Sequence, residues 1–140
     1  MPLPSRGGSV FTKMAEFCVL TCQKLYLYIE QIKESFMEGF IYKITNDINN
    51  KMYIGKTLHS IEKRFEEHLK DAYTDNKKNR PLYKAIRKYG PEHFHIELIE
   101  KANIHELSDR EVYWISFYNT YKEGYNATLG GDGRMLYDYD

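Results

Sequence analysis

Cysteine and proline are scarce in this sequence of 140 residues, and it has no long apolar run. Cys18 and Cys22 are too few for a disulfide framework or a cysteine-type zinc site, and we expect them to be buried as small apolar side chains on a helix. Glu16 and Lys24 bracket the apolar run 17–22 too closely for a membrane span. No cleavage site of a secretory signal follows it. We therefore expect a soluble intracellular protein, cytoplasmic or, in a eukaryote, nuclear.

Net charge is also absent, because 20 Lys and Arg balance 20 Asp and Glu. The distribution along the chain is uneven, however. Residues 39–90 hold twelve basic against six acidic residues, whereas residues 91–140 hold four against ten. A basic half beside an acidic half fits a protein that presents one face to a polyanion. Mixing of the two halves on the folded surface is the alternative, and it stays open.

The hydrophobic content of 42 % and aromatic content of 15 % are enough for one packed domain. Steps of four and three separate apolar or small residues from Met14 to Ile32, which predicts an amphipathic helix from about 13 to 38 after a loose leader. Gly39 is expected to end this helix. Further patterns predict strands over 39–45, 51–56 and 93–99 and helices over 60–73, 79–90 and 104–118. The sum is an α+β fold, a small three-stranded antiparallel sheet flanked by helices.

The first two strands form a hairpin around a polar turn. A loop closed at 46–49 pairs Thr45 with Asn50, and the same register sets Tyr42 opposite Tyr53. Cross-strand partners project from one face of a sheet. Both phenols are therefore expected side by side.

Arg64 and His68 lie one turn apart on the next helix, at the border of the apolar stripe that faces the sheet. From this position they can converge on one ligand. A guanidinium at the edge of the core and a satisfied boundary histidine are the plainer interpretation.

Glu111 falls in the middle of an apolar stripe on the last helix, between Leu107 and Ile115. A carboxylate buried there needs a cation, a proton or hydrogen bonds, because burying it alone costs several kcal/mol. A hard divalent ion such as Mg²⁺ is one solution. A buried pair with an arginine or a tyrosine is the other.

Taken together, the sequence resembles the GIY-YIG nuclease family over about residues 39–130. The resemblance rests on six features in order and spacing: Tyr42, Tyr53-Ile54-Gly55, Arg64, His68, Glu111 and Gly124-Tyr125-Asn126. One departure is that Gly39 stands one residue early, so that the first motif reads Gly-Phe-Ile-Tyr. The tyrosine and the strand pattern are retained.

The resemblance implies a DNA endonuclease that uses Mg²⁺ or Mn²⁺. Glu111 is then the protein ligand of the ion, which contacts a non-bridging oxygen and the leaving 3′ oxygen, and Arg64 binds the scissile phosphate. Tyr42 and Tyr53 position and deprotonate the attacking water, with His68 as proton acceptor or as partner of a phenol. Asn126 orders the site through hydrogen bonds, and Lys56 adds positive charge. The resemblance does not decide which tyrosine is the base.

Three further signals are weaker. Basic residues around the helix 79–90 could contact phosphates, although a solvated charged face is nearly as common; they are Lys77, Lys78, Arg80, Lys84, Arg87 and Lys88. On the strand 93–99, Phe94, Ile96 and Leu98 are expected inside and His93, His95 and Glu97 outside. The latter three could chelate a transition metal, but a solvated face is the usual outcome. Gly130-Gly131 is expected to be a flexible exit.

These patterns divide the chain into three parts. Residues 1–38 hold a leader and a helix outside the resemblance, 39–130 the nuclease domain and 131–140 a tail. The N-terminal helix could mediate self-association or contact a partner. Two alternative functions remain, a structure-selective DNA repair nuclease and a catalytically idle nucleic-acid-binding or assembly module.

Overall fold

The computed structural model describes residues 6–131, with side chains from residue 12 onward. The chain divides into two compact units, Met1–Met37 and Glu38–Asp140, and each is described by itself. Most of the predicted tail lies outside the described residues. Within them, no helix combines the length and the apolar character needed to cross a bilayer.

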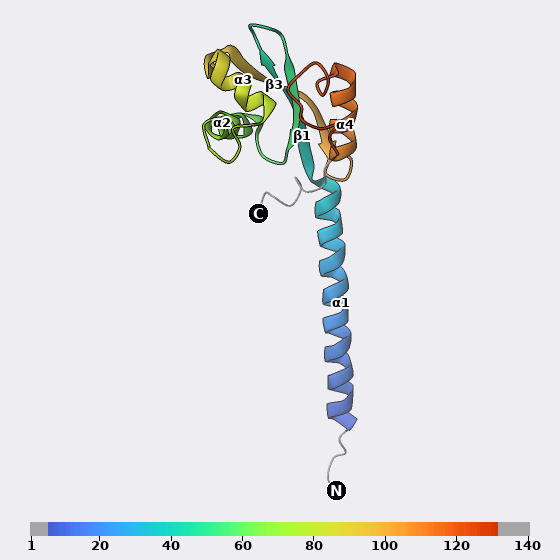
Figure 1. The fold of residues 1–140 in the computed structure, drawn as a ribbon. Helices are drawn as coiled ribbons and strands as arrows, with labels where there is room; N and C mark the ends of the chain where they lie inside the picture. Colours follow the sequence, from blue (N-terminus) through green and yellow to red (C-terminus); the bar gives the residue numbers. More distant parts are fainter. Residues whose placement is uncertain (1–5, 132–140) are drawn as a thin grey trace. The chain divides into compact units, whose positions relative to one another are not determined.

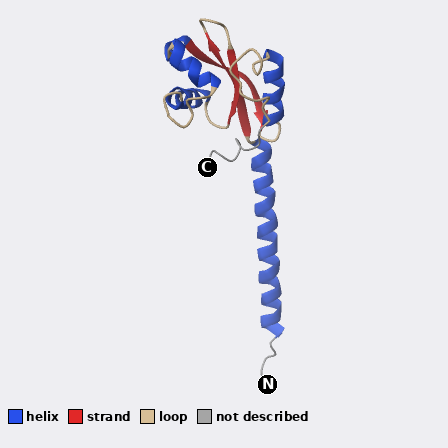
Figure 2. Cartoon of the chain, viewed as in Figure 1, coloured by secondary structure: helices blue, strands red, loops and turns tan. Residues whose placement is uncertain are grey.

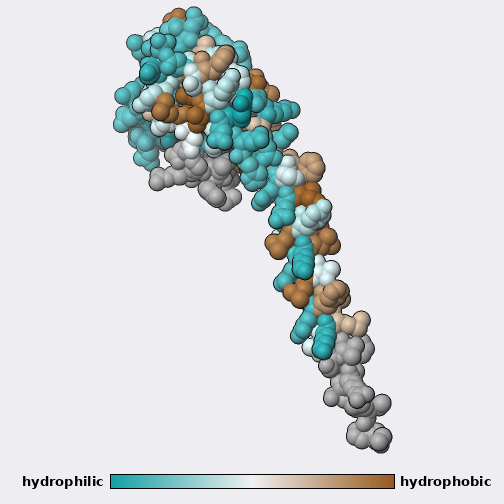
Figure 3. Space-filling view, turned by 90° about the vertical axis from the view of Figure 1, so that its right-hand side faces the viewer, coloured by the Kyte–Doolittle hydropathy of each residue, from teal (hydrophilic) through white to brown (hydrophobic). Residues whose placement is uncertain are grey.

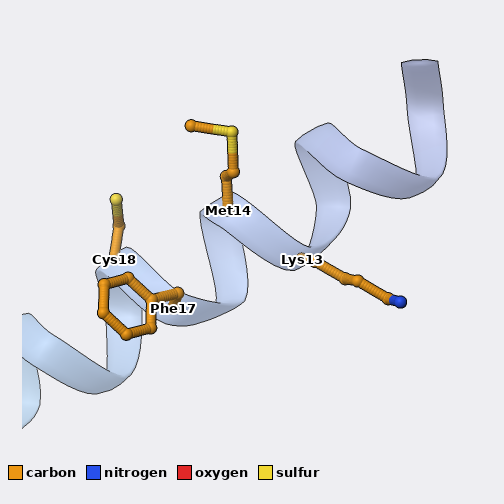
Figure 4. Close-up of a pocket in the computed structure, with 4 residues that line it drawn as sticks. All are labelled: Lys13, Met14, Phe17 and Cys18. Carbon is orange, nitrogen blue, oxygen red and sulfur yellow. The ribbon is translucent and has the colours of Figure 1, made fainter.

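The first unit consists of helix α1, Arg6–Phe36. The helix begins earlier than predicted, since Gly7 and Gly8 are helical rather than part of a loose leader. Its apolar stripe is exposed, and so are both cysteines, so the expectation that Cys18 and Cys22 are buried is wrong. Figure 4 shows Met14 and Cys18 projecting in the same direction one turn apart, while Lys13 extends away from them.

The second unit is the predicted α+β domain. A three-stranded antiparallel sheet has the order β2-β1-β3, with β1 Glu38–Asn46 in the centre. Helices α2 and α3 cover one face and α4 covers the other (Figures 1 and 2). The remaining bounds are β2 Met52–Thr57, α2 Ile61–Asp71, α3 Pro81–Tyr89, the 3-10 turn η1 Pro91–His93, β3 Phe94–Asn103 and α4 Leu107–Tyr118.

Local chemistry explains the helix ends. The Ser60 side chain accepts a hydrogen bond from the Lys63 backbone N–H at 3.3 Å and so caps the start of α2. Pro81 opens α3 and Gly90, with φ +93°, closes it. Gly39 does not end α1, because the helix stops at Phe36 and Gly39 lies inside β1. A side chain at position 39 would collide with Leu107, so the glycine lets α4 approach the sheet.

The predicted hairpin register is wrong by two residues. Thr45 lies opposite Met52 and Tyr42 lies opposite Gly55. The loop closes one residue later than expected, because the Asn46 N–H donates to the Lys51 carbonyl at 3.0 Å and Asn50 takes a left-handed conformation, φ +60°. A shift of two residues preserves the face of every side chain. Tyr42 and Tyr53 therefore still project from the same side of the sheet.

The third strand also differs from the prediction. His93 belongs to η1, and β3 continues to Asn103. The pairing with β1 skips one residue at Ile99, since Ile41 lies opposite Glu100 and Tyr42 opposite Leu98. Such a bulge inverts the alternation of side chains, so that Glu100 faces α4. Leu98, expected inside, is 45 % exposed.

Two apolar clusters lie on the two faces of the sheet. The cluster under α2 and α3 includes Tyr42, Ile44, Tyr83 and Ile86. The cluster under α4 is smaller and includes Ile41, Ile54, Ala102, Leu107 and Ile115. The candidate site residues come from both faces.

Candidate active site

A buried chain of three polar side chains crosses the layer between the sheet and the helices α2 and α3. The Tyr42 hydroxyl lies 2.7 Å from His68 Nε2, and the Tyr83 hydroxyl lies 3.0 Å from His68 Nδ1. All three residues are at most 1 % exposed. Both imidazole nitrogens therefore have a phenol as partner, and the central strand β1 is linked to both helices.

His68 is the more deeply placed of the two residues predicted on α2. It was expected at the border of the core and is fully buried, while Ile61, Phe65 and Leu69 of the same helix pack against the apolar cluster under α2 and α3. Burial, followed by the charge of Arg64, lowers the pKa of His68 well below its ordinary value of 6.5. The imidazole is therefore neutral at physiological pH, with one N–H donor and one acceptor nitrogen.

Arg64 precedes His68 by one helical turn. Its Nη1 donates to Glu67 Oε2 at 2.9 Å, and the side chain is 12 % exposed. This position keeps the guanidinium at the rim of the buried chain.

Tyr53 lies on β2, at the edge of the sheet. Its ring centroid lies 6.3 Å from that of Tyr42 and 5.4 Å from that of His68. Burial and, after it, the charge of Glu111 raise the pKa of Tyr53 to about 12, against the opposing effect of Arg64. Tyr53 therefore stays protonated and lies within the fields of both Arg64 and Glu111.

Gly55 leaves room for the Tyr42 ring. The two residues are cross-strand partners, and a Cβ at position 55 would collide with the hydroxyl and the ring carbons of Tyr42. Gly55, the last residue of the Tyr-Ile-Gly motif, is therefore required for the Tyr42 ring to pack in this position.

Asn126 is bound to the outer edge of β2. Its Oδ1 accepts a hydrogen bond from the Ile54 N–H at 2.8 Å, and its Nδ2 donates to the Ile54 carbonyl at 2.8 Å. The neighbouring Tyr125 N–H donates to the Met52 carbonyl at 2.9 Å. The segment after α4 therefore fixes the strand that carries Tyr53.

Glu111 is 5 % exposed on α4, and Leu107 and Ile115 on the same face are buried completely or almost so. The predicted placement of a carboxylate inside an apolar stripe is confirmed. Gly130 closes over it with φ +85°: a Cβ there would lie 2.9 Å from Glu111 Oε1 and 2.7 Å from an Ile115 methyl. Gly130, expected to be a flexible exit, is thus packed against the carboxylate.

The predicted substrate-binding cations have different surroundings. Lys84 and Lys88 are exposed on α3. The Arg87 guanidinium donates to the backbone carbonyls of Ala72 and Lys78 and so ties down the segment between α2 and α3. Lys56 is buried and donates to Ser108 Oγ at 2.8 Å. Contact of these four residues with a phosphate stays a prediction.

The histidines of the third strand do not assemble a metal site. His95 is exposed between Asp47 and Glu97, at 2.6 and 3.2 Å, while His93 lies in η1 beside Glu92. No group of three or more potential His, Cys, Asp or Glu ligands occurs among the described residues.

Sequence reasoning missed Tyr83. A signal was present, because Leu82, Tyr83, Ala85 and Ile86 form the buried face of α3, and a phenol on a buried face requires a polar partner. The partner lies on α2, and no local pattern in the sequence pairs the two helices.

Comparisons with known proteins agree with this geometry. The family model described as "GIY-YIG catalytic domain" matches residues 38–126, more than half of the chain. The catalytic domain of the intron endonuclease I-TevI superposes with a TM-score of 0.58 at 29 % identity, covering 66 % of this chain and 95 % of that domain.

Two curated relatives are viral. Intron-associated endonuclease 1 of Enterobacteria phage T4 is 32 % identical over 67 % of this chain and 40 % of its own length. The uncharacterised protein 019R of Invertebrate iridescent virus 6 is 34 % identical over 59 % of this chain and 29 % of its own. The chain thus spans less than half the length of these relatives. By the family match and the superposed catalytic fold, the chain belongs to the GIY-YIG nuclease family.

Proposed function

We propose that this chain is a metal-dependent DNA endonuclease, which acts in the compartment that holds its DNA, the cytoplasm or a nucleus. The observation that carries the proposal is the arrangement around β1 and β2. A phenol lies 2.7 Å from a neutral imidazole, a guanidinium lies one turn away, and a buried carboxylate approaches from the opposite layer. These groups match the needs of phosphodiester hydrolysis: a proton acceptor for water, a cation for the phosphate and a ligand for a metal ion.

In the proposed reaction, a water molecule attacks phosphorus and the bond to the 3′ oxygen breaks; the 3′ oxygen takes a proton from solvent, which leaves a 5′-phosphate and a 3′-hydroxyl. Tyr42 takes the proton from water while its own hydroxyl proton passes to His68 Nε2. The 2.7 Å separation allows this transfer, and the neutral imidazole has one unprotonated nitrogen to receive the proton; because burial and the charge of Arg64 lower the pKa of His68, the proton stays there only briefly. Tyr53, whose pKa is raised to about 12, stays protonated and donates a hydrogen bond to the water or the phosphate. Arg64 offsets the charge that develops on the phosphate.

Glu111 is the proposed ligand of Mg²⁺ or Mn²⁺. A single carboxylate, with no group of three or more potential ligands within residues 12–131, suits a hard ion that keeps several waters and binds substrate oxygens as well. Such an ion supplies Lewis-acid stabilisation of the phosphate. The Gly130 backbone packs closely beside this carboxylate.

For DNA binding, we infer that the exposed cations of α3 contact phosphates. Lys84 and Lys88 extend from this helix, whose opposite face carries Tyr83. Arg87 acts indirectly by holding the segment between α2 and α3. The binding constant should then fall with rising salt concentration.

We also propose that residues 39–130 form the nuclease domain and that the preceding helix mediates self-association. The stripe of α1 repeats in steps of four and three, the spacing of a two-stranded coiled coil. Its members are exposed, Leu25 by 56 % and Tyr28 by 60 %, and Figure 3 shows apolar side chains between hydrophilic ones along α1.

Leu25→Asp should reduce the molar mass of the particle in solution, as measured by light scattering. Leu27→Asp, equally exposed but outside the stripe, should not.

The decisive experiment is cleavage of supercoiled plasmid by the purified chain, with Mg²⁺ or with chelator. Glu111→Ala should abolish nicking and linearisation while DNA binding in a gel-shift assay stays close to normal. Glu66→Ala, an exposed glutamate on α2, is the matched control and should cut like the wild type. Cutting by Glu111→Ala at the wild-type rate would refute the proposal.

Further assays on the same purified protein distinguish the two alternative functions. Cleavage of branched or flapped DNA without cleavage of plasmid identifies a structure-selective repair nuclease. DNA binding without cleavage of any substrate identifies an idle binding module. The intact buried carboxylate on an apolar face favours an enzyme, because a binding module gains nothing from it.

A further inference from the structure

Tyr83 of α3 occupies the far side of the imidazole from Tyr42. Its hydroxyl lies 3.0 Å from His68 Nδ1, and its ring is 1 % exposed. The ring centroids of His68 and Tyr83 lie 5.8 Å apart. Both nitrogens are therefore engaged at once, Nδ1 by Tyr83 and Nε2 by Tyr42.

A neutral imidazole carries one N–H, and its position is set by the hydrogen bonds that the two nitrogens make. His68 is neutral, because burial and then the charge of Arg64 lower its pKa. If Nδ1 carries the proton, Nε2 is an acceptor directed at the Tyr42 hydroxyl. If Nε2 carries it, the imidazole has no free lone pair for the proton of Tyr42.

We propose that Tyr83 is a positioning residue whose phenolic oxygen accepts a hydrogen bond from His68 Nδ1–H and thereby keeps Nε2 unprotonated and directed at Tyr42. When Tyr42 gives up its proton, Nε2–H forms, Nδ1–H is retained and Tyr83 keeps its own hydroxyl proton. The consequence for catalysis rests on the proposed function, whereas the tautomer of His68 does not.

The surroundings of Tyr83 favour the acceptor role. Burial, and after it the charge of Asp71, raises the pKa of the Tyr83 phenol, which makes it a weaker donor and a better acceptor. The Arg80 guanidinium lies 5.8 Å from the ring centroid and presents only donors.

The other groups that face His68 do not compete for Nδ1. Tyr42 bonds Nε2, and the Tyr53 ring meets the imidazole edge on. Arg64, Arg80 and Lys77 act on it through charge and oppose a second proton.

The test is the tautomer of His68 read from ¹⁵N chemical shifts of the full chain, with His68→Ala identifying its signals. The wild type should show Nδ1–H and an unprotonated Nε2. In Tyr83→Phe, which removes only the hydroxyl, this preference should be lost. Tyr73→Phe, a tyrosine 60 % exposed two residues after α2, is the matched control and should leave the signals unchanged. An Nε2–H tautomer in the wild type, or an unchanged tautomer in Tyr83→Phe, would overturn the proposal.

Single-turnover cleavage then tests the consequence. Tyr83→Phe should lower the rate constant at saturating DNA at least about tenfold, by analogy with the lower end of the loss when the partner that orients a metal-binding histidine is removed. The apparent affinity for DNA should not change. In a His68→Ala background, the same substitution should lower the rate no further, because Tyr83 acts through His68.

A rate loss that persists in the His68→Ala background would show that Tyr83 acts by another route and would overturn the proposal. A melting curve of Tyr83→Phe separates loss of fold from loss of positioning. If the wild type cuts no DNA but shows the expected tautomers, the proposed function fails while the assignment of Tyr83 holds.

Discussion

Replacing Asn126 by alanine should destabilise the domain and lower cleavage together. The side-chain amide makes two hydrogen bonds of 2.8 Å to the same residue, one to the N–H and one to the carbonyl of Ile54. Ile54 is 1 % exposed, so water does not replace the lost partner readily. Both backbone groups then stay buried without a hydrogen bond.

Two hydrogen bonds, each with a net contribution of about 1 kcal/mol, are lost, and the abandoned backbone groups add the cost of their desolvation. We therefore expect the free energy of unfolding to fall by about 2–4 kcal/mol. For a domain of this size, such a change lowers the melting temperature by about 10 °C or more. Tyr53 neighbours Ile54 on the released strand, so the cleavage rate of the folded protein should fall as well.

Thermal unfolding followed by circular dichroism measures the first effect, and plasmid cleavage well below the melting temperature measures the second. Asn126→Asp separates the two hydrogen bonds, since its carboxylate can accept from the Ile54 N–H but cannot donate to the carbonyl. Asn76→Ala, in the exposed loop between α2 and α3, is the matched control. A melting temperature of Asn126→Ala equal to that of the wild type would refute the assigned role.

Three further predictions concern separate parts of the site. Gly55→Ala should displace the Tyr42 ring and lower the cleavage rate, with folding checked by circular dichroism, since a Cβ there has no space. Lys84→Ala should weaken DNA binding and reduce its salt dependence without lowering the melting temperature, whereas Arg87→Ala should lower the melting temperature; the reverse result would exchange their roles. The contribution of His68 to the free energy of unfolding should be complete above pH 6.5 and should decrease as the pH falls below it, by up to about 1.4 kcal/mol per pH unit. The reason is that His68 takes up a proton in the unfolded chain at this pH, whereas in the folded chain it stays neutral to a lower pH. His68→Gln should remove this part of the pH dependence in melting curves.

Side-chain periodicity was sufficient to predict the faces on which Glu111, Tyr42 and Tyr53 lie. Helical spacing placed Glu111 between Leu107 and Ile115, and all three are buried on one face of α4. Strand alternation placed Tyr42 and Tyr53 on one face of the sheet. Both predictions depend on a period of fixed length within one element, which tertiary contacts do not change.

Features that depend on backbone conformation or on contacts between elements were not predictable in this way. The left-handed conformation of Asn50 moved the hairpin register, and the bulge at Ile99 reversed the alternation of β3. The same limit applies to side chains, because the burial of Lys56 against Ser108 and the pairing of Tyr83 with His68 both require knowledge of which helix packs where.

The position of β2 at the edge of the sheet explains how residues of the two layers can belong to one candidate site. The sheet separates His68, on the α2 side, from Glu111, on the α4 side, and a strand in the centre would keep them apart. Tyr53 lies at this edge, and the charges of both Arg64 and Glu111 affect its pKa. An edge strand also offers unpaired backbone groups to other chains, a liability that proteins cover in several ways. Here Tyr125 and Asn126 occupy those groups, so the segment that follows α4 protects the edge and fixes the tyrosine that lies on it.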